Sequence, residues 1–346
     1  MKDHFFSSKH PNRSTPFFLS VVFSFYNEAT VLSELIRRVR AVLHYQLERK
    51  VISGYELIFV DDASTDRSKE LLVQEARSGD IVLVEMSRNF GPSECVMAGL
   101  SQSRGDAVLY MDSDLQDPPE LIPELLDKWV ADPETEVVYT TRRIRSGEHP
   151  LKLLLTKVGY RFINSISEIE LPLDSGDFKL LSRRVVDLLV TLEEKKPYIR
   201  GLVSWVGFKQ EQVFYDREAR FDGQDNTKCR VMSRKVIDGY LDRALISFSD
   251  VPLKLSLLLG FSVTLASLGY ILVVLIQKAM GWYTPGWPAI MVAVLLLGGI
   301  ILMVLGFLGL YINIIFLETK RRPNYIIKNV MRPHDLRQDR PVEASH

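Results

Sequence analysis

The segment Ala107-Val108-Leu109-Tyr110-Met111-Asp112-Ser113-Asp114 places two alternate carboxylates directly after five apolar residues. A short apolar run bounded in this way is typical of a buried strand. Two earlier segments have the same form: residues 18–25 run into Tyr26-Asn27-Glu28, and residues 55–60 run into Asp61-Asp62. The carboxyl ends of parallel strands meet at one edge of a sheet, where ligands bind. We therefore expect these polar groups to gather in one site.

The order of apolar and amphipathic segments predicts the fold class. Short apolar strands alternate with amphipathic helices, which is the pattern of a parallel sheet covered by helices on both faces. The expected strands are residues 18–25, 55–60, 81–87, 107–111 and 137–141. The expected helices are residues 28–48, 64–78, 93–103 and 119–130. The prediction is an α/β protein with a Rossmann-like, mostly parallel sheet.

The composition excludes several classes of protein. The 346 residues include 43 Lys and Arg against 43 Asp and Glu, so the formal net charge is zero and no nucleic-acid partner is indicated. Hydrophobic residues make up 47% and charged residues 25%, which are values of a globular protein. The two cysteines, Cys95 and Cys229, cannot form a disulfide framework, and the six histidines form no cluster with metal-ligand spacing. Cys95 is expected to be a small buried apolar residue.

Two uncharged stretches near the C-terminus predict a membrane anchor. Residues 255–276 and 279–317 contain no charged side chain, and a helix that crosses a bilayer needs about 20 apolar residues. We expect transmembrane helices at 252–277 and 288–317, with two buried core helices as the alternative. The basic tail, 318–346, favours the cytoplasm for both termini and for the α/β domain. The short connection between the two helices would lie outside.

Residues 150–166 form an amphipathic segment. Its apolar residues lie on one stripe at helical spacing, with lysine and arginine beside the stripe. This pattern fits a helix in the membrane interface whose basic side chains reach lipid headgroups, and an ordinary surface helix packed on the sheet is the alternative. A second interfacial helix is expected at 228–248. The chain as a whole divides into an N-terminal tail, 1–15, an α/β domain, 16–248, and the membrane hairpin with its tail. Both interfacial helices belong to the α/β domain.

The acidic motifs suggest two kinds of binding. The adjacent carboxylates Asp61 and Asp62 repel each other unless donors reach them, and a nucleotide supplies such donors in its base and ribose. Capping of the next helix by Ser64 or Asp66 is the alternative, but capping does not require the acidic pair. Alternate carboxylates after a strand suit Mg²⁺ or Mn²⁺, which take one or two carboxylates together with phosphate oxygens.

Taken together, these motifs resemble those of family 2 glycosyltransferases. The motifs are Tyr26-Asn27-Glu28, Val60-Asp61-Asp62-Ala63-Ser64-Thr65-Asp66, Arg88-Asn89-Phe90-Gly91 and Asp112-Ser113-Asp114-Leu115-Gln116-Asp117-Pro118-Pro119-Glu120. Within the family, the chain is most similar to the polyprenyl-phosphate glycosyltransferases, which include bactoprenol glucosyltransferases and dolichol-phosphate mannose synthases. Later segments agree with this resemblance: Gly176-Asp177-Phe178-Lys179-Leu180, Ile199-Arg200-Gly201-Leu202, Trp205-Val206-Gly207 and Ser247-Phe248-Ser249.

The resemblance implies a GT-A fold and an inverting hexosyltransferase. The donor would be a nucleotide sugar, UDP-glucose before GDP-mannose, UDP-GlcNAc or UDP-galactose, and the acceptor would be the phosphate of polyprenyl (undecaprenyl) phosphate. The resemblance also implies a Mg²⁺ or Mn²⁺ cofactor, a multi-pass protein in the lipid bilayer of the inner cell membrane, and a homo-oligomer, in this group a tetramer. A processive polysaccharide synthase is disfavoured because the chain has no Gln-x-x-Arg-Trp motif. The intact acidic motifs disfavour a non-catalytic scaffold.

The resemblance further implies roles for individual residues. The nucleotide-binding residues would be Tyr26, Asn27, Glu28, Asp61, Asp62, Asn89, Ser113, Arg220 and Lys228. The metal ligands would be Asp112, Asp114 and Gln116, and the acceptor phosphate would be held by Arg142, Lys152 and Thr156. Asp177 and Arg200 would line the sugar and acceptor pocket and would be catalytic together with Asp112 and Asp114. Whether Asp177 acts as a base stays open.

Some of these residues have other interpretations. Lys179 stands where the family commonly has arginine. The turn that follows Arg220 is longer than usual, which makes Arg217 a rival for the diphosphate contact. Trp205 is expected in the core rather than in a site. Arg142 could instead be a solvated charge, and Arg200 could instead pair with a structural carboxylate. The alternative for Asp177 is a turn residue after Gly176.

Overall fold

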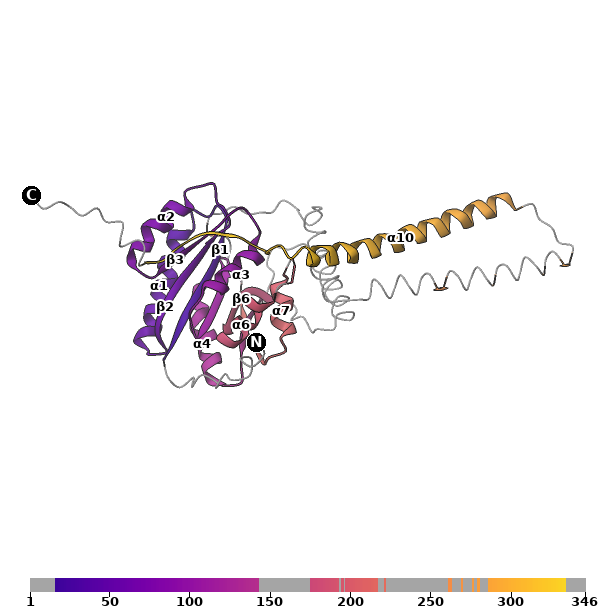
Figure 1. The fold of residues 1–346 in the computed structure, drawn as a ribbon. Helices are drawn as coiled ribbons and strands as arrows, with labels where there is room; N and C mark the ends of the chain where they lie inside the picture. The colour runs from indigo at the N-terminus through magenta and orange to yellow at the C-terminus, as the bar shows by residue number, and fades with distance from the viewer. Residues whose placement is uncertain are drawn as a thin grey trace, which may run out of the picture. The chain divides into compact units, whose positions relative to one another are not determined.

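The computed structural model describes residues 16–142, 175–216 except 193 and 196, and 286–333, together with a few isolated positions between 221 and 280. The chain divides into two compact units. The first unit contains the α/β domain and also the segment that begins at Pro323, and the second contains the apolar helix α10, Trp287–Thr319. Figure 1 draws the elements of both units along the chain.

A single sheet forms the centre of the first unit. Its strand order across the described residues is β7-β5-β6-β4-β1-β2-β3-β8. Most strands run parallel to one another, whereas β6 and β8 run antiparallel to their neighbours. The strands are β1 Phe17–Phe25, β2 Ile52–Asp61, β3 Ile81–Met86, β4 Ala107–Asp112, β5 Val137–Arg142, β6 Ser175–Ser182, β7 Gln210–Tyr215 and β8 Ile327–Met331.

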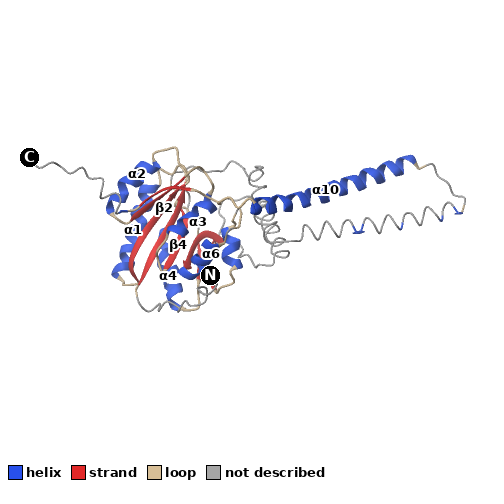
Figure 2. Ribbon diagram, viewed as in Figure 1, coloured by secondary structure: helices blue, strands red, loops and turns tan. Residues whose placement is uncertain are grey.

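Amphipathic helices cover both faces of this sheet (Figure 2). They are α1 Leu32–Glu48, α2 Ser68–Glu75, α3 Pro92–Gln102, α4 Ile122–Ala131, α6 Arg183–Thr191 and α7 Ile199–Trp205, with the short 3-10 helices η1 Ala76–Ser78 and η2 Pro119–Leu121. The buried side chains of α1 include Leu32, Leu35, Ile36, Val39 and Leu43, which recur at helical spacing. Burial of this stripe against the sheet, more than intrinsic propensity, stabilises the helix.

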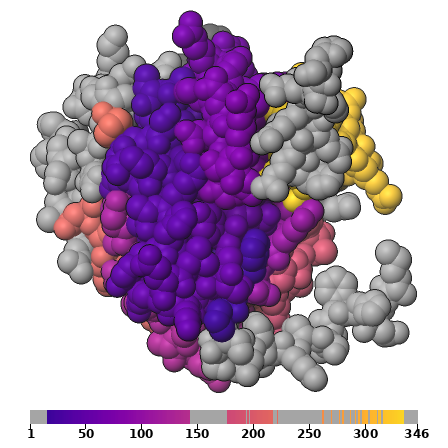
Figure 3. All heavy atoms as spheres, turned by 90° about the vertical axis from the view of Figure 1, so that its left-hand side faces the viewer, coloured from indigo at the N-terminus to yellow at the C-terminus, as the bar shows by residue number. Residues whose placement is uncertain are grey.

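The core lies between the sheet and the helices. On one face, alternate residues of β1 pack with α1 and α4, and the ring of Phe17 meets the edge of Trp129 at 4.8 Å between centroids. On the opposite face α3 approaches β1 closely, because a Cβ at Gly99 would lie 2.3 Å from a methyl carbon of Val22. Figure 3 is a space-filling view from the left-hand side of Figure 1. On the face that it shows, the N-terminal half of the chain, in indigo and purple, makes up most of the coloured surface.

The predicted fold class is confirmed, since the sheet is mostly parallel and flanked by helices. The five predicted strands are present within a few residues of their expected bounds. Two helices begin later than expected, at Leu32 and Ser68, because the residues before them form turns. Glu28, for example, accepts the backbone N–H groups of Val31 and Leu32 at 3.0 and 3.2 Å. The sequence analysis missed β6, β7, β8, α6 and α7.

Helix α10 is described by itself. Its segment Leu297–Thr319 is 23 residues long with a mean hydropathy of 2.6, so it is long and apolar enough to cross a membrane. This helix includes the segment predicted at 288–317. The predicted helices at 150–166, 228–248 and 252–277 and the tail 1–15 lie outside the described residues, apart from a few isolated positions.

The segment after α10 returns to the sheet of the first unit. Strand β8 pairs antiparallel with β3, so that Val330 lies opposite Val84 and Asn329 opposite Glu85. The N–H of Ser87 continues this ladder by donating to the carbonyl of Ile326 at 2.9 Å. The stretch predicted only as a basic tail, 318–346, therefore contains an edge strand of the α/β domain.

Candidate active site

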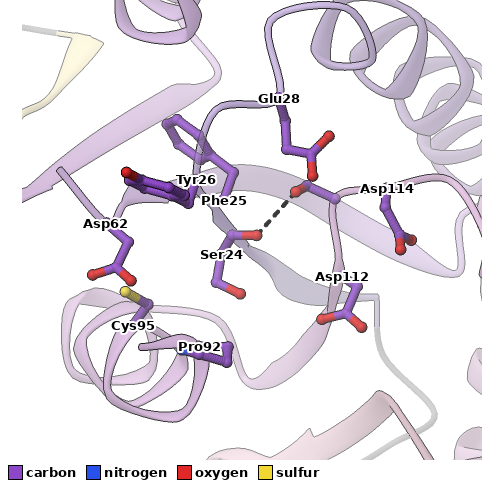
Figure 4. A pocket seen from close by; sticks show the side chains of 10 residues that line it. Ser24, Phe25, Tyr26, Glu28, Asp62, Pro92, Cys95, Asp112 and Asp114 are labelled. Carbon is purple, nitrogen blue, oxygen red and sulfur yellow. Dashed lines mark hydrogen bonds between the residues drawn. The ribbon is translucent and has the colours of Figure 1, made fainter. Parts of the chain in front are cut away.

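Three strands end side by side at the carboxyl edge of the sheet. Ser24 of β1 lies opposite Asp112 of β4, and Phe25 of β1 lies opposite Asp61 of β2. The parallel register therefore gathers the three polar motifs, as the sequence predicts. A pocket of about 250 Å³ opens at this edge. It is lined by Ser24, Phe25, Tyr26, Glu28, Asp62, Pro92, Cys95, Asp112, Ser113 and Asp114 (Figure 4).

The pocket has an acidic side and a side formed by α3. In Figure 4, Asp112 and Asp114 lie on one side with Glu28, whereas Asp62 and Cys95 lie on the other. The hydroxyl of Ser113 donates to the carbonyl of Ser24 at 3.0 Å, which ties the loop after β4 to the end of β1. The predicted residues Glu28, Asp62, Asp112, Ser113 and Asp114 therefore share one cavity.

The adjacent carboxylates after β2 find their donors within the protein. Asp61 accepts the backbone N–H of Ser64 at 2.8 Å. The two oxygens of Asp62 accept the N–H groups of Phe90 and Gly91 at 2.7 and 2.9 Å, and these bonds hold the loop before α3 against the end of β2. A nucleotide is therefore not needed to explain why two carboxylates stand together here, although Asp62 also lines the pocket.

Asn27 ties the loop after β1 to the loop after β2. Its side-chain oxygen accepts the backbone N–H of Thr65 at 2.8 Å, and its backbone N–H donates to the hydroxyl of Ser64 at 3.0 Å. The neighbouring amide of Asn89 donates to the carbonyl of Asp62 at 3.4 Å. Both Asn side chains thus shape the loops around the pocket. The ring of Tyr26, in contrast, is 46% exposed.

Each of the three acid-bearing loops contains a residue in the left-handed region. The φ angles are 57° at Asn27 after β1, 60° at Ala63 after β2 and 57° at Leu115 after β4. Residues other than glycine rarely adopt this conformation, and those that do concentrate at functional sites. Leu115 is held by burial, and Asn27 is held by its hydrogen bond from the backbone N–H of Thr65.

The acidic side concentrates negative charge. Burial, together with the carboxylates of Asp177, Asp114 and Asp117, raises the pKa of Asp112 to about 8, against the opposing field of Arg200. A cation at this position would relieve both the repulsion and the cost of burial.

A divalent cation fits this donor set. Among the described residues, no three His, Cys, Asp or Glu side chains form a complete metal cage. Asp112 and Asp114 supply two carboxylates, and Mg²⁺ is usually bound by one or two carboxylates plus phosphate and water oxygens. The backbone N–H of Gln116 donates to Asp114 at 3.0 Å, which orients this carboxylate.

Asp177 and Arg200 form an ion pair beside the acidic loop. The guanidinium of Arg200, on α7, bonds both carboxylate oxygens of Asp177, on β6; Nε lies 2.6 Å from Oδ1, and Nη2 bonds Oδ2. Burial raises the pKa of Asp177, but the bonds to Arg200 and the fields of Arg200, Lys179 and Arg142 outweigh it, so the pKa lies below its usual value. A carboxylate held in this way is a weak base. Asp177 lies within a strand rather than in a turn.

Arg142 belongs to a partly buried cluster rather than to open solvent. Its Nε donates to the hydroxyl of Tyr215 at 3.1 Å, and its Nη2 lies 3.9 Å from Oδ1 of Asp117. The hydroxyl of Tyr215 also donates to Asp117, which is fully buried. The cluster connects the end of β5 to the acidic loop and to β7. Arg142 therefore ends β5 at a fixed position near the pocket.

Several predictions about site residues lie outside the described residues. These are Lys152, Thr156, Arg220, its rival Arg217, and Lys228.

Within the described residues, the sequence analysis missed two members of the Arg142 cluster. Asp117 stands before two prolines, and its sequence position therefore indicates a turn. Tyr215 ends a strand that was not predicted. The prediction that Trp205 is a core residue is wrong, because its side chain is 55% exposed. Cys95 is buried as predicted.

Comparison with known proteins adds to these observations. The model of "Glycosyl transferase family 2" matches residues 20–189. "Uncharacterized glycosyltransferase YkcC" of Bacillus subtilis (strain 168) is 39% identical over 89% of this chain and 93% of that protein. The "Prophage bactoprenol glucosyl transferase homolog" of Escherichia coli (strain K12) is 33% identical over 90% of this chain and 99% of that protein. A solved structure of glucosyl-3-phosphoglycerate synthase from Mycobacterium tuberculosis, with Mn²⁺, UDP and glucosyl-3-phosphoglycerate, has a TM-score of 0.44 and 20% identity over 66% of this chain and 81% of that chain.

The α/β sheet, the acidic pocket at its carboxyl edge, the family model and the two sequence relatives together define a glycosyltransferase. The chain belongs to glycosyl transferase family 2. The family predicted from the sequence motifs is therefore confirmed.

Proposed function

We propose that this enzyme transfers a hexose from a nucleotide sugar to the phosphate of a polyprenyl phosphate, at the cytoplasmic face of the cell membrane. UDP-glucose is the proposed donor and undecaprenyl phosphate the proposed acceptor. The observation that carries the proposal is the pairing of two opposite charge patterns at one sheet edge. Asp112 and Asp114 suit a cation with a diphosphate, and Arg200 and Arg142 beside them suit a second anion. The name of the Escherichia coli relative supports the choice of sugar and lipid.

The donor would occupy the pocket at the ends of β1, β2 and β4. Tyr26 offers an exposed ring on which a base can stack, and Glu28 and Asp62 line the same cavity as acceptors for base and ribose donors. Asn27, Asn89 and Asp61 would act by holding the surrounding loops, because they form hydrogen bonds with protein groups. Binding to preformed loops loses less conformational entropy than binding to mobile ones.

A Mg²⁺ or Mn²⁺ ion would be held by Asp112 and Asp114, with Gln116 next to them. When bound, such an ion neutralises charge that develops on the leaving diphosphate. Within the protein, the task of the acidic loop is to keep these side chains in place. The fixed loop geometry, with Leu115 in the left-handed region and Gln116 bonded to Asp114, serves that task.

The chemistry requires orientation of two anions more than proton transfer. An oxygen of the lipid phosphate attacks the anomeric carbon, the bond from that carbon to the donor diphosphate breaks, and its electron pair leaves with the diphosphate. The nucleophile is already anionic at neutral pH, so no base has to remove a proton. Arg200 and Arg142 would hold the acceptor phosphate against the repulsion of the diphosphate. Asp177 would position Arg200 rather than act as a base, in keeping with its lowered pKa.

The membrane region suits such an acceptor. Withdrawing a polyprenyl chain from a bilayer costs about 0.8 kcal/mol for each exposed CH₂ group, so the enzyme must work at the membrane surface. Helix α10 is long and apolar enough to cross the membrane. We propose that it forms a hairpin with a second spanning helix at 252–277, and that residues 150–166 and 228–248 lie in the interface. Both termini would then be cytoplasmic.

The test is a transfer assay with purified enzyme in lipid. Undecaprenyl phosphate is incubated with radiolabelled UDP-glucose, GDP-mannose, UDP-GlcNAc or UDP-galactose, with Mg²⁺, Mn²⁺ or EDTA. Transfer of glucose in the presence of metal is expected, with a β-linked product by NMR, because a single displacement inverts an α-linked donor. Exclusive use of another sugar would refute the assigned donor. Retention of configuration, or full activity of Asp112→Ala and Asp114→Ala variants in EDTA, would refute the mechanism.

A further inference from the structure

A buried lysine lies behind the Asp177–Arg200 ion pair and takes no part in it. Lys179 of β6 is fully buried, and within the described part of the structure its ammonium has no hydrogen-bond acceptor. The hydroxyl of Tyr110 on the neighbouring strand β4 is likewise buried without a partner. Burial of a charge without an acceptor is strongly unfavourable, so the presence of Lys179 at this position calls for an explanation.

The strand register places Lys179 on the same face of the sheet as the site. Tyr110 lies directly opposite Lys179 in the antiparallel pair of β4 and β6. Asp112 and Asp177 each stand two residues further along these strands, and side chains two residues apart share a face. Lys179 is thus in line with the acidic loop and the ion pair, one step deeper into the protein.

The electrostatic surroundings of Lys179 consist of the same groups. Burial lowers the pKa of Lys179 to about 8, Asp177 acts against this shift, and Arg200 adds to it. The ammonium also lies 6.0 Å from the centroid of the Tyr139 ring, within the range of a weak cation–π contact. Lys179 therefore interacts with Asp177 through space, while the direct bonds of Asp177 go to Arg200.

We propose that Lys179 is a positioning residue that lets Arg200 exchange partners, from Asp177 in the free enzyme to the acceptor phosphate in the complex. This inference rests on the proposed function, in which Arg200 binds that phosphate. When Arg200 leaves, the carboxylate of Asp177, which is 35% exposed, keeps a charge that water compensates only in part, so breaking the pair still costs free energy. Lys179 stays behind as a second cation next to Asp177, so the loss of Arg200 does not leave Asp177 alone.

Three cations act on Asp177, namely Arg200, Lys179 and Arg142, and the proposal explains why one of them, Lys179, is enclosed. Arg200 is 29% exposed and reaches the surface of the site, whereas Lys179 is enclosed. The exposed cation can therefore bind a substrate, and the enclosed one cannot. A neutral residue at position 179 would fill the same space. Without the charge of Lys179, however, Arg200 would bind Asp177 more tightly, and the acceptor phosphate would bind Arg200 more weakly.

The experiment compares Lys179→Met, which removes the charge at similar volume, with Lys179→Arg, which keeps it. Binding of undecaprenyl phosphate in detergent micelles and binding of the nucleotide sugar are each measured by titration calorimetry, and transfer is measured in the same samples. Lys179→Met should weaken acceptor binding at least tenfold and change nucleotide affinity less than twofold. Lys179→Arg should restore acceptor binding to within about threefold of wild type. Tyr110→Phe, which removes a buried polar group without a charge, should change acceptor binding less than twofold.

A second pair of variants keeps the proposal testable if Lys179→Met folds poorly. In an Asp177→Asn background no carboxylate needs compensation, so adding Lys179→Met should weaken acceptor binding less than twofold further. Equal losses of acceptor and nucleotide binding, an equal effect of Tyr110→Phe, or a full additional loss in the Asp177→Asn background would each overturn the proposal. If the wild-type enzyme neither binds undecaprenyl phosphate nor transfers sugar to it, the proposed function fails instead.

Discussion

Replacing Asp62 by Asn tests whether this carboxylate holds the loop before α3 or contacts the ligand directly. Asp62 is 5% exposed, and each of its two oxygens accepts one backbone N–H, from Phe90 and from Gly91. An asparagine has only one side-chain oxygen, and its NH₂ group would face the second N–H. The change therefore removes one charge-assisted hydrogen bond and leaves one buried donor without an acceptor.

The magnitude follows from these two losses. A hydrogen bond to a charged group contributes about 1.5–3 kcal/mol, and an unsatisfied buried donor costs about 1–3 kcal/mol. Because the two terms partly overlap, Asp62→Asn should destabilise the α/β domain by about 2–4 kcal/mol. For a domain of this size, each kcal/mol lowers the melting temperature by roughly 2–4 °C. The expected decrease is therefore about 5–15 °C.

The assay is thermal unfolding of the purified protein in detergent, combined with titration of the nucleotide sugar. Asp127→Asn is the matched control, because Asp127 is exposed on α4 and forms a surface ion pair with Arg49 at 3.3 Å. The control should melt within about 1 °C of wild type. If Asp62→Asn also melts within about 1 °C of wild type but binds the nucleotide sugar tenfold more weakly, Asp62 is a ligand contact and its structural role is refuted.

Three further predictions concern metal binding, the ion pair and the core. The pKa of Asp112 rises from 3.8 to about 8 on folding, so the free energy of unfolding decreases from pH 4 to 8 as this carboxyl ionises in the unfolded chain but keeps its proton in the folded one. A metal ion must displace that proton, so stabilisation by Mg²⁺ or Mn²⁺, read as a melting shift, should be larger at pH 8 than at pH 6, and an equal shift would contradict this. Asp177→Asn should leave acceptor binding no weaker, because it removes the carboxylate that competes with the acceptor phosphate for Arg200, and it should leave the pH dependence of kcat unchanged, whereas loss of the acidic limb of the kcat profile would identify Asp177 as a base. Gly99→Ala should lower stability by about 1–3 kcal/mol, because its Cβ would lie 2.3 Å from a methyl carbon of Val22; unchanged denaturant unfolding would show that α3 moves aside freely.

The sequence was most informative where one rule decided the structure. Short apolar runs predicted the parallel strands β1 to β5, and the acidic motifs that follow β1, β2 and β4 predicted the edge at which these side chains meet. The strands that escaped prediction are those with mixed patterns. Strand β6 interrupts its apolar run with Asp177 and Lys179, and β8 is a short, half-buried strand with Lys328 and Asn329 exposed. Their pairing depends on distant partners, β4 and β3, which local pattern does not reveal.

The site was predictable in its residue types and less so in their roles. Asp112 and Asp114 were identified because alternate carboxylates after an apolar strand suit a divalent ion and because acidic motifs also follow two other strands. The functions of Asp61, Asp62 and Asn27 in holding loops follow from backbone N–H groups on neighbouring loops, and one sequence does not show which loops lie side by side. The same holds for Trp205, whose large apolar ring indicated a core position although it stands at the exposed end of α7.

The return of the chain to the sheet after α10 affects how this protein can be dissected. A soluble fragment that stops before the hydrophobic region would lack β8 and would leave the outer edge of β3 without a partner. Strand β3 is buried along its whole length when β8 is present, with the sequence Ile-Val-Leu-Val-Glu-Met. Bare edges of this kind pair with other chains and aggregate. A truncated enzyme would therefore need residues 323–333 supplied as a fused segment or as a separate peptide.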